Sequence, residues 1–364
     1  MDALQQAALI RARSALDLAA GGPVRQPGLL ASRYLKSRAA GNPREAEAFA
    51  DAHRYGDVVK AAVTAITSGN SPALLEVGAD FMAAVRARSI VARALANMRK
   101  LPVNTPSVRQ TAGARASWVT EGGAVPLSDG VYTKDAALDL LKVAAITPVS
   151  RELARAGTAD LLLSRDLVAA CAEAIDEAFC DPTNAGLAGN SPASVFYNAS
   201  AGASAGPGAE GFRADVDELM AAFAGNLDTA ALVCDSRTVM QLAALEVGIR
   251  FNGREATFAG LPVLYSTAVP RAANGGMLGL VDLDRVTVVG MEEAELAASR
   301  EASLLMADNP DMSSVTPKAA QLVPMFQTGT IALMGTVYAN WRAAPGAACY
   351  IGQVDYLSLP VASS

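Results

Sequence analysis

WVTEGGAVPLSDGVYTKDAALDLLKVAAITPVSREL (residues 118–153) and TADLLLSRDLVAACAEAIDEAFCDPT (residues 158–183) are the consecutive stretches from which the fold can be predicted. The second stretch is typical of one long helix. Its apolar residues recur at steps of three and four positions, and they are Leu163, Leu167, Ala170, Ala174 and Ala178. Thr158 is a candidate N-cap and Pro182 ends the helix. A helix of about 22 residues is roughly 33 Å long, which is enough to cross a subunit.

The first stretch predicts a two-stranded arm. Trp118 and Val119 are expected to form a short strand, and the residues from Tyr132 to Ile146 a long return strand. Glycines and prolines break the chain between them, at Gly122, Gly123, Pro126 and Gly130. Because an isolated two-stranded ribbon is marginally stable in water, the arm needs a surface to lie on. A neighbouring subunit is the natural candidate.

The composition of the 364 residues predicts a large apolar core and excludes some partners. Hydrophobic residues make up 51% of the chain and charged residues 18%. The net charge of −6 argues against a generic nucleic-acid binder, whose surface carries a basic excess. A basic cluster does occur between Arg86 and Lys100, including Arg88, Arg93 and Arg99. We interpret it as a solvated helix face, with packaged DNA or a neighbouring subunit as alternative contacts.

The cysteines and the terminal segments indicate a reducing compartment and no membrane span. Cys171, Cys180, Cys234 and Cys349 form no CxxC pair, which is typical of buried thiols. The first 20 residues predict an amphipathic helix and show no signal peptide. The uncharged run from Ala319 to Trp341 contains a proline, glycines and threonines, so we interpret it as buried strands.

The remaining segments alternate helices with strands. A linker at residues 21–28 separates the first helix from a second helical block, Leu30 to Ile66, and Ser68 to Pro72 ends that block. Nothing before this break is expected to belong to the main core. Residues 74–100 predict one or two helices, 101–116 an extended segment, and 183–211 a long surface loop. A compact α/β lobe is expected from Phe212 onward, in which Ser236 caps a helix, and the last strands end at Trp341.

The chemistry expected of an enzyme is missing from the sequence. His53, the one histidine, lies in a predicted surface helix without a nucleophile motif beside it. The acidic stretch from Asp308 to Asp311 is better interpreted as a proline turn than as a metal site. No phosphate-binding or dinucleotide fingerprint occurs. We therefore predict no catalytic, cofactor-binding or metal-binding residues, no cofactor, and no enzymatic activity.

The order of these parts resembles the major capsid proteins of tailed bacteriophages, which have the HK97 fold. The first matching motif runs from Trp118 to Gly122, continues at Pro126 to Ser128, and ends with Tyr132 and Lys134. The second, VSREL at residues 149–153, precedes the long helix, and the third is FAGLPV at residues 258–263. Arg300, Glu301 and the strands from Phe326 to Trp341 resemble the last strands of that family. The resemblance covers roughly residues 74–343.

The resemblance implies an α+β fold with an N-terminal arm, an extended two-stranded loop, a peripheral domain with a long spine helix, and an axial domain. The implied boundaries are 1–73 for a helical, scaffold-like N-terminal segment, 74–117 for the N-terminal arm, 118–148 for the extended loop, 149–211 with 314–364 for the peripheral domain, and 212–313 for the axial domain.

Two departures from the family pattern carry expectations of their own. Some relatives crosslink the loop through a lysine just before the proline at its tip, but here Val125 precedes Pro126 and no lysine lies between Trp118 and Lys134. We expect a shell without that crosslink. The segment from Met1 to Thr67 is either a scaffold that a maturation protease removes or a retained arm, and we favour the scaffold.

The function that the resemblance implies is a major capsid protein. Copies of it would assemble as hexamers and pentamers into an icosahedral shell around phage or prophage double-stranded DNA. A scaffold or maturation protease and a portal are further implied partners, and a membrane is not. The expected location is the virion capsid, assembled in the cytoplasm of a bacterial host. Two alternatives stay open: an encapsulin-like shell around protein cargo, and a soluble α+β enzyme.

Overall fold

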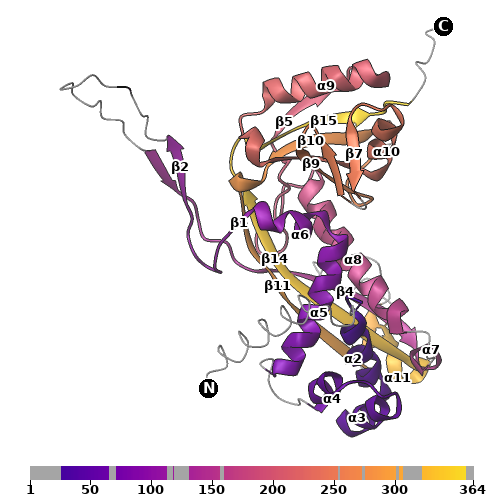
Figure 1. The fold of residues 1–364 in the computed structure, drawn as a ribbon. Helices are drawn as coiled ribbons and strands as arrows, with labels where there is room; N and C mark the ends of the chain where they lie inside the picture. Colours follow the sequence, from indigo (N-terminus) through magenta and orange to yellow (C-terminus); the bar gives the residue numbers. More distant parts are fainter. Residues whose placement is uncertain are drawn as a thin grey trace.

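The computed structural model describes residues 26–64, 71–112, 118, 131–155, 160–252, 255–272, 275–300, 303–305 and 322–357. These residues form an elongated molecule with a sheet-and-helix lobe at each end (Figure 1). A slender arm leaves the molecule near the junction of the lobes and points away from both. The predicted mixture of helices and strands is confirmed.

The first lobe is built on a four-stranded sheet. The strand order is β1 (Arg99–Lys100), β11 (Val286–Ser299), β14 (Thr330–Ala343) and β4 (Leu141–Ser150). β14 is antiparallel to both of its neighbours, whereas β1 is parallel to β11. Helix α5 (Pro72–Arg88) packs on β11, helix α8 (Asp160–Cys180) packs on β4 and β14, and the two helices contact each other. One face of this sheet is therefore covered by a helix pair.

The second lobe is built on a seven-stranded mixed sheet. Its order is β5 (Ser200–Ala203), β15 (Ala348–Val354), β10 (Gly276–Asp282), β6 (Ala230–Asp235), β9 (Leu261–Ser266), β8 (Glu255–Phe258) and β7 (Ile249–Asn252). Helices α9 (Gly208–Ala222) and α10 (Ser236–Ala244) pack on one face of it. In β6, Leu232 faces these helices, and Ala231 and Val233 face the main core. This alternation is the two-residue period of a strand that is buried on both faces.

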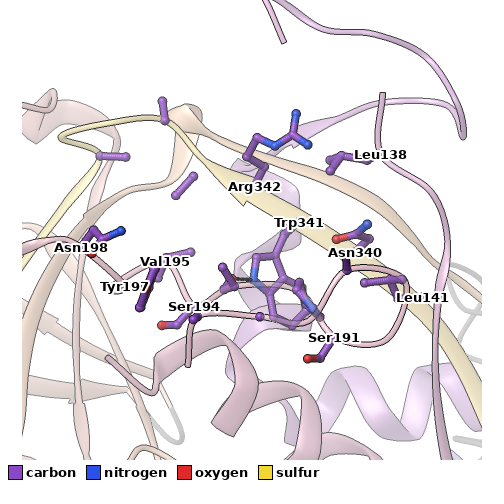
Figure 2. Close-up of a pocket in the computed structure, with 18 of the residues that line it drawn as sticks. Leu138, Leu141, Ser191, Ser194, Val195, Tyr197, Asn198, Asn340, Trp341 and Arg342 are labelled. Atoms are coloured by element: carbon purple, nitrogen blue, oxygen red, sulfur yellow. Dashed lines mark hydrogen bonds between the residues drawn. The ribbon is translucent and has the colours of Figure 1, made fainter. Parts of the chain in front are cut away.

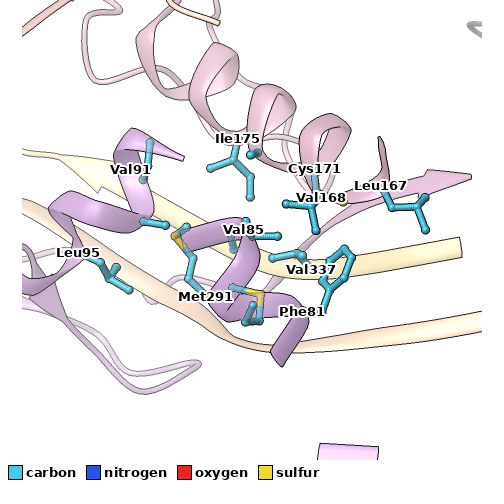
Figure 3. Packing of buried hydrophobic residues seen from close by; sticks show 14 of the residues in the cluster. Phe81, Val85, Val91, Leu95, Leu167, Val168, Cys171, Ile175, Met291 and Val337 are labelled. Atoms are coloured by element: carbon cyan, nitrogen blue, oxygen red, sulfur yellow. The ribbon is translucent and has the colours of Figure 1, made fainter. Parts of the chain in front are cut away.

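The main core is continuous across both lobes. Phe81 and Val85 of α5 meet Leu167, Val168, Cys171 and Ile175 of α8 above the sheet (Figure 3). Gly335 of β14 leaves room for the Phe81 ring, because a β-carbon at this glycine would lie 3.0 Å from the ring. Two chain segments also join the lobes: β10 continues through Leu283–Arg285 into β11, and β14 continues through residues 344–347 into β15.

The N-terminal helices belong to this core, which corrects the expectation that nothing before Ser68 does so. They are α2 (Leu29–Ala40), α3 (Pro43–Ala52) and α4 (Asp57–Thr64). α2 contacts α5, α8 and β11, and its residues Ala31 and Leu35 are fully buried in the main cluster. The sequence does not reveal this packing, because even the nearest of these partners, α5, begins 32 positions after α2 ends (72 − 40).

The long helix is confirmed, since α8 ends at Cys180, just before Pro182. The prediction of one long return strand is wrong. The chain from Tyr132 to Ile146 forms β3 (Val131–Lys134) and the first part of β4, with residues 135–140 irregular between them. Trp118 is not in a strand, and the outgoing strand of the arm is β2 (Val108–Ala112).

Other differences concern a helix cap and the C-terminal strand. α10 is capped by Asp235, whose carboxylate accepts the N–H groups of Arg237 and Thr238, and not by Ser236. The sequence predicts no strand after Trp341, but β15 lies beside β10 in the seven-stranded sheet. Likewise β5 lies in the seven-stranded sheet, and β11 lies in the four-stranded one. The chain therefore passes between the two sheets several times.

The remaining elements are short, and several predictions fall beyond the described ranges. The short elements are α6 (Ile90–Ala94), α7 (Arg151–Arg155), α11 (Met325–Thr328), β12 (Ser303–Leu305), β13 (Leu322–Pro324) and the 3-10 turns at Leu95–Asn97, Leu227–Thr229 and Leu283–Arg285. Four predictions lie outside the described residues. They concern the first 20 residues, the cap at Thr158, the loop tip with Val125, and the stretch from Asp308 to Asp311.

Candidate assembly surface

The arm carries apolar side chains into solvent. β2 and β3 pair in an antiparallel ribbon that projects from the body (Figure 1). Val108 and Tyr132 on these strands are more than half exposed, and Trp118 is fully exposed. Since large exposed side chains grouped on one element mark interaction sites, and a two-stranded ribbon needs support, the arm has the properties of one half of an interface.

The root of the arm is fixed to strand β14. The side-chain amide Nδ2 of Asn340 donates to the carbonyl of Asp139 at 2.6 Å, and Nη1 of Arg342 donates to the carbonyl of Ala136 at 2.7 Å. The N–H of Asn104 donates to the carbonyl of Leu138 at 3.2 Å. These bonds divert residues 135–140 from the strand ladder, which is the physical reason why β3 and β4 are separate.

Polar contacts also join the two strands of the arm at its base. The N–H of Asp135 donates to the carbonyl of Ser107 at 2.9 Å, and Nε of Arg109 lies 3.5 Å from the Asp135 carboxylate. Both side chains of this ion pair are about one quarter exposed, so solvent weakens it, and it contributes on the order of 0.2–1 kcal/mol. The hydrogen bonds at the root, and not this ion pair, set the direction of the arm.

A cavity of about 620 Å³ lies beside the arm root. Figure 2 shows its walls: Leu138 and Leu141 from the arm root, the loop with Ser191 to Asn198, and the end of β14 with Asn340 to Arg342. The indole N–H of Trp341 donates to the carbonyl of Ala193 at 2.9 Å and thereby fixes the loop to β14. The polar groups of β14 are thus used for structure, and this arrangement is not that of a catalytic cleft.

The loop of residues 183–211 is more ordered than a surface loop suggests. Asn184 donates through Nδ2 to the carbonyls of Ala178 and Pro192, and the hydroxyl of Ser194 donates to the carbonyl of Phe179 at 2.7 Å. Phe196 is buried in the main core. Asn184 and Ser194 therefore anchor this segment to α8.

The basic cluster is engaged within the subunit. Arg86 donates to the carbonyl of Met291, Arg88 pairs with Glu173 at 2.9 Å, Arg93 donates to the carbonyl of Tyr265, and Arg99 donates to that of Val108. These bonds link α5 and the segment after it to β11, α8, β9 and the arm. Arg86, Arg88, Arg99 and Lys100 are exposed, as a solvated face would be, and the hydrogen bonds of the arginines in addition tie elements together.

The described residues hold no arrangement that resembles a catalytic or metal centre. At the C-cap of α3, Nδ1 of His53 donates to the carbonyl of Phe49, 2.9 Å away, and the imidazole stacks on the Phe49 ring. Within the described ranges no three His, Cys, Asp or Glu side chains group as metal ligands. No helix in the described part of the chain is long and apolar enough to cross a membrane.

All four cysteines are free and buried. Burial raises the pKa of the Cys171 and Cys349 thiols to about 11. It also raises the pKa of the Cys180 and Cys234 thiols well above the ordinary value. Such thiols are neutral and unreactive at neutral pH, so they behave as core side chains.

Comparison with known proteins gives consistent matches. The model of the "Phage capsid family" matches residues 75–336. A capsid polyprotein of Pseudomonas phage PAJU2 is 30% identical over 368 residues, which cover 91% of this chain and 54% of that protein. The chain therefore spans about half the length of the curated relative it matches.

Solved structures of low sequence identity also match. A structure from Gordonia phage Cozz matches with a TM-score of 0.48 and 15% identity, over 73% of this chain and 86% of that one. The capsid of a native GTA particle matches with a TM-score of 0.47 and 14% identity, over 72% of this chain and 90% of that one.

Proposed function

The chain belongs to the phage capsid family, and from this premise we propose that it is a structural shell subunit and not an enzyme. The observation that carries the proposal is the projecting arm with its exposed apolar side chains and its fixed root. A fixed arm that lies on the next copy makes a heterologous contact, and such contacts close into rings when the rotation between copies is right. Many modest contacts of this kind hold a shell together.

We assign the lobes to the parts that the family resemblance implies. The four-stranded sheet with α5 and α8 is the peripheral domain, the seven-stranded sheet with α9 and α10 is the axial domain, and β2–β3 belong to the extended loop. Sheet membership supports this division, because β5 and β15 pair within the seven-stranded sheet and β11 pairs within the four-stranded sheet.

We assign the partners from the family and the charge. The chief partner is the chain itself, as hexamers and pentamers in the shell of a virion-like particle. Double-stranded DNA is the proposed content, and a portal and a maturation protease are proposed to act during assembly in the bacterial cytoplasm. The net charge of −6 supports an inner surface that does not bind packaged DNA tightly.

Electron microscopy and light scattering of the purified full-length chain test the function. We expect closed shells or rings of five and six copies. A variant in which a four-residue Gly-Ser linker replaces Arg109–Lys134 should remain folded and should not assemble. Persistence of a monomer or dimer for the unaltered chain under all assembly conditions would contradict the proposal. Protein cargo in place of DNA inside native particles would favour an encapsulin-like shell.

A further inference from the structure

We propose that helices α2–α4 are a permanent layer of the subunit core and remain in the assembled shell, with Asp80 of α5 as the residue that positions the start of α2. This differs from the removable scaffold that sequence analysis favours for residues 1–67. The proposal rests on the proposed function in one respect, because its decisive test uses assembled particles.

The first observation is that α2 is buried around most of its circumference. Four consecutive residues, Tyr34 to Ser37, are buried, and consecutive helical residues point about 100° apart. Four such positions cover most of the helix circumference. Lys36 is 1% exposed, and Ser32 and Ser37 are fully buried. Since lysine is almost never fully buried unless it is paired, a buried lysine is typical of an element inside a folded core.

The second observation is that α2 begins in a fitted contact with α5. Its N-cap residue, Gly28, has φ of 86° and makes no side-chain cap. Asp80 of α5 takes over this role: its Oδ2 accepts from the N–H of Leu30 at 2.8 Å and from the N–H of Ala31 at 3.1 Å. A β-carbon on Gly28 would lie 3.2 Å from that of Ala84. The start of α2 is therefore shaped for α5, and a carboxylate at a helix N-terminus also suits the helix dipole.

The third observation is that the other helices of the block share the same core. Val59 and Val63 of α4 are fully buried in the main cluster, and α4 contacts α5. The guanidinium of Arg33 in α2 lies 5.2 Å from the centre of the Tyr55 ring, which follows α3. Both the first and the last helix of the block thus contact α5.

The two residues that precede Gly28 lie beside α5 and α8 as well. Gln26 and Pro27 line a cavity of about 900 Å³ together with Ala84 and Arg88 of α5 and with residues of α8. The helical block thus begins between the two helices that cover the sheet. Its removal would expose the apolar sides of α5 and α8 to water, at a cost that grows with the exposed area. A segment of this chain that leaves during assembly therefore ends before Gln26.

The decisive experiment is quantitative peptide mass spectrometry of particles purified from cells that make the complete particle. We expect peptides from residues 29–64 in a ratio of about one to one with peptides from α8, whether or not the chain is cut between the block and α5. Particles depleted of residues 29–64 would overturn the proposal and leave the shell function intact. Failure to form any particle would instead count against the function.

A second experiment tests Asp80 in the full-length chain. Asp80→Ala removes the acceptor for two N–H groups, and loss of a cap lowers the melting temperature by about 2–4 °C. We also expect proteases to cut residues 26–64 faster in the Asp80→Ala variant than in the unaltered chain. Asp217→Ala is the matched control, because Asp217 is an exposed acidic residue on helix α9. Equal melting temperatures and equal proteolysis of the two variants would overturn the positioning role of Asp80.

Discussion

The hydroxyl of Thr336, in the middle of β14, is fully buried and has no hydrogen-bond partner in the described structure. A buried hydroxyl without a partner costs free energy, because its bonds to water are lost and not replaced. We predict that Thr336→Val, which has nearly the same shape, raises the free energy of unfolding of the unassembled subunit by about 1 kcal/mol. Urea unfolding measures this change. Thr336→Ser keeps the hydroxyl and removes a methyl group, so it should lower stability instead.

The four buried thiols allow a chemical prediction at the same scale. In the folded subunit at pH 8, we expect none of the four to react quickly with a thiol reagent, and all four to react after unfolding in denaturant. Quick labelling of Cys171 or Cys349 without denaturant would contradict the buried positions.

The raised pKa values of the buried thiols also make the stability of the subunit depend on pH. Between the ordinary pKa of 9.0 and about 11, the unfolded chain binds fewer protons than the folded one, so stability falls as pH rises.

The helix N-caps show when a sequence identifies the residue that caps a helix and when it does not. The capping box of α3, formed by Asn42 and Glu45, is visible in sequence because its members are three positions apart. Asp235 and Ser236 are adjacent cap candidates, and the choice between them depends on the exact end of β6. Asp80 caps a helix 50 positions away, and no local pattern carries that information.

At the scale of elements, the arm root makes a prediction that separates folding from assembly. The double variant Asn340→Ala, Arg342→Ala removes the two side chains that hold residues 136–139 against β14. We expect a subunit that is folded and less stable by about 1–3 kcal/mol, with assembly reduced at least tenfold by light scattering. Arg237→Ala, at an exposed position on α10, is the control and should assemble normally. Normal shells from the double variant would show that the direction of the arm is set elsewhere.

Helix α8 and the return strand show which elements can be predicted. The apolar period of α8 and the proline after it are local, so both its existence and its end were predicted. The break between β3 and β4 arises from Asn340 and Arg342, about 200 positions further along, and the alternating pattern of the chain continues through it. Similarly, β15 follows β14 after a short turn, and the sequence predicts no strand there.

At the scale of the whole molecule, the sequence of the arm predicts a shell without covalent links through this loop. No lysine lies between Trp118 and Lys134, so the expected crosslinking group is missing there. Mature particles dissolved in denaturant and run on a gel should give one band at the mass of a single subunit. A ladder of multiples would refute this. The prediction is independent of the arm-root variant, which tests geometry and not covalent chemistry.

Two connections described above, β10 to β11 and β14 to β15, run directly from one sheet into the other. The arm root is hydrogen-bonded to β14 just before this crossing. A pull on the arm by a neighbouring copy therefore passes along covalent backbone into the second sheet, where β15 pairs with β10 along six residues. The arm root, the four-stranded sheet and the seven-stranded sheet are thus joined by continuous backbone and by strand pairing.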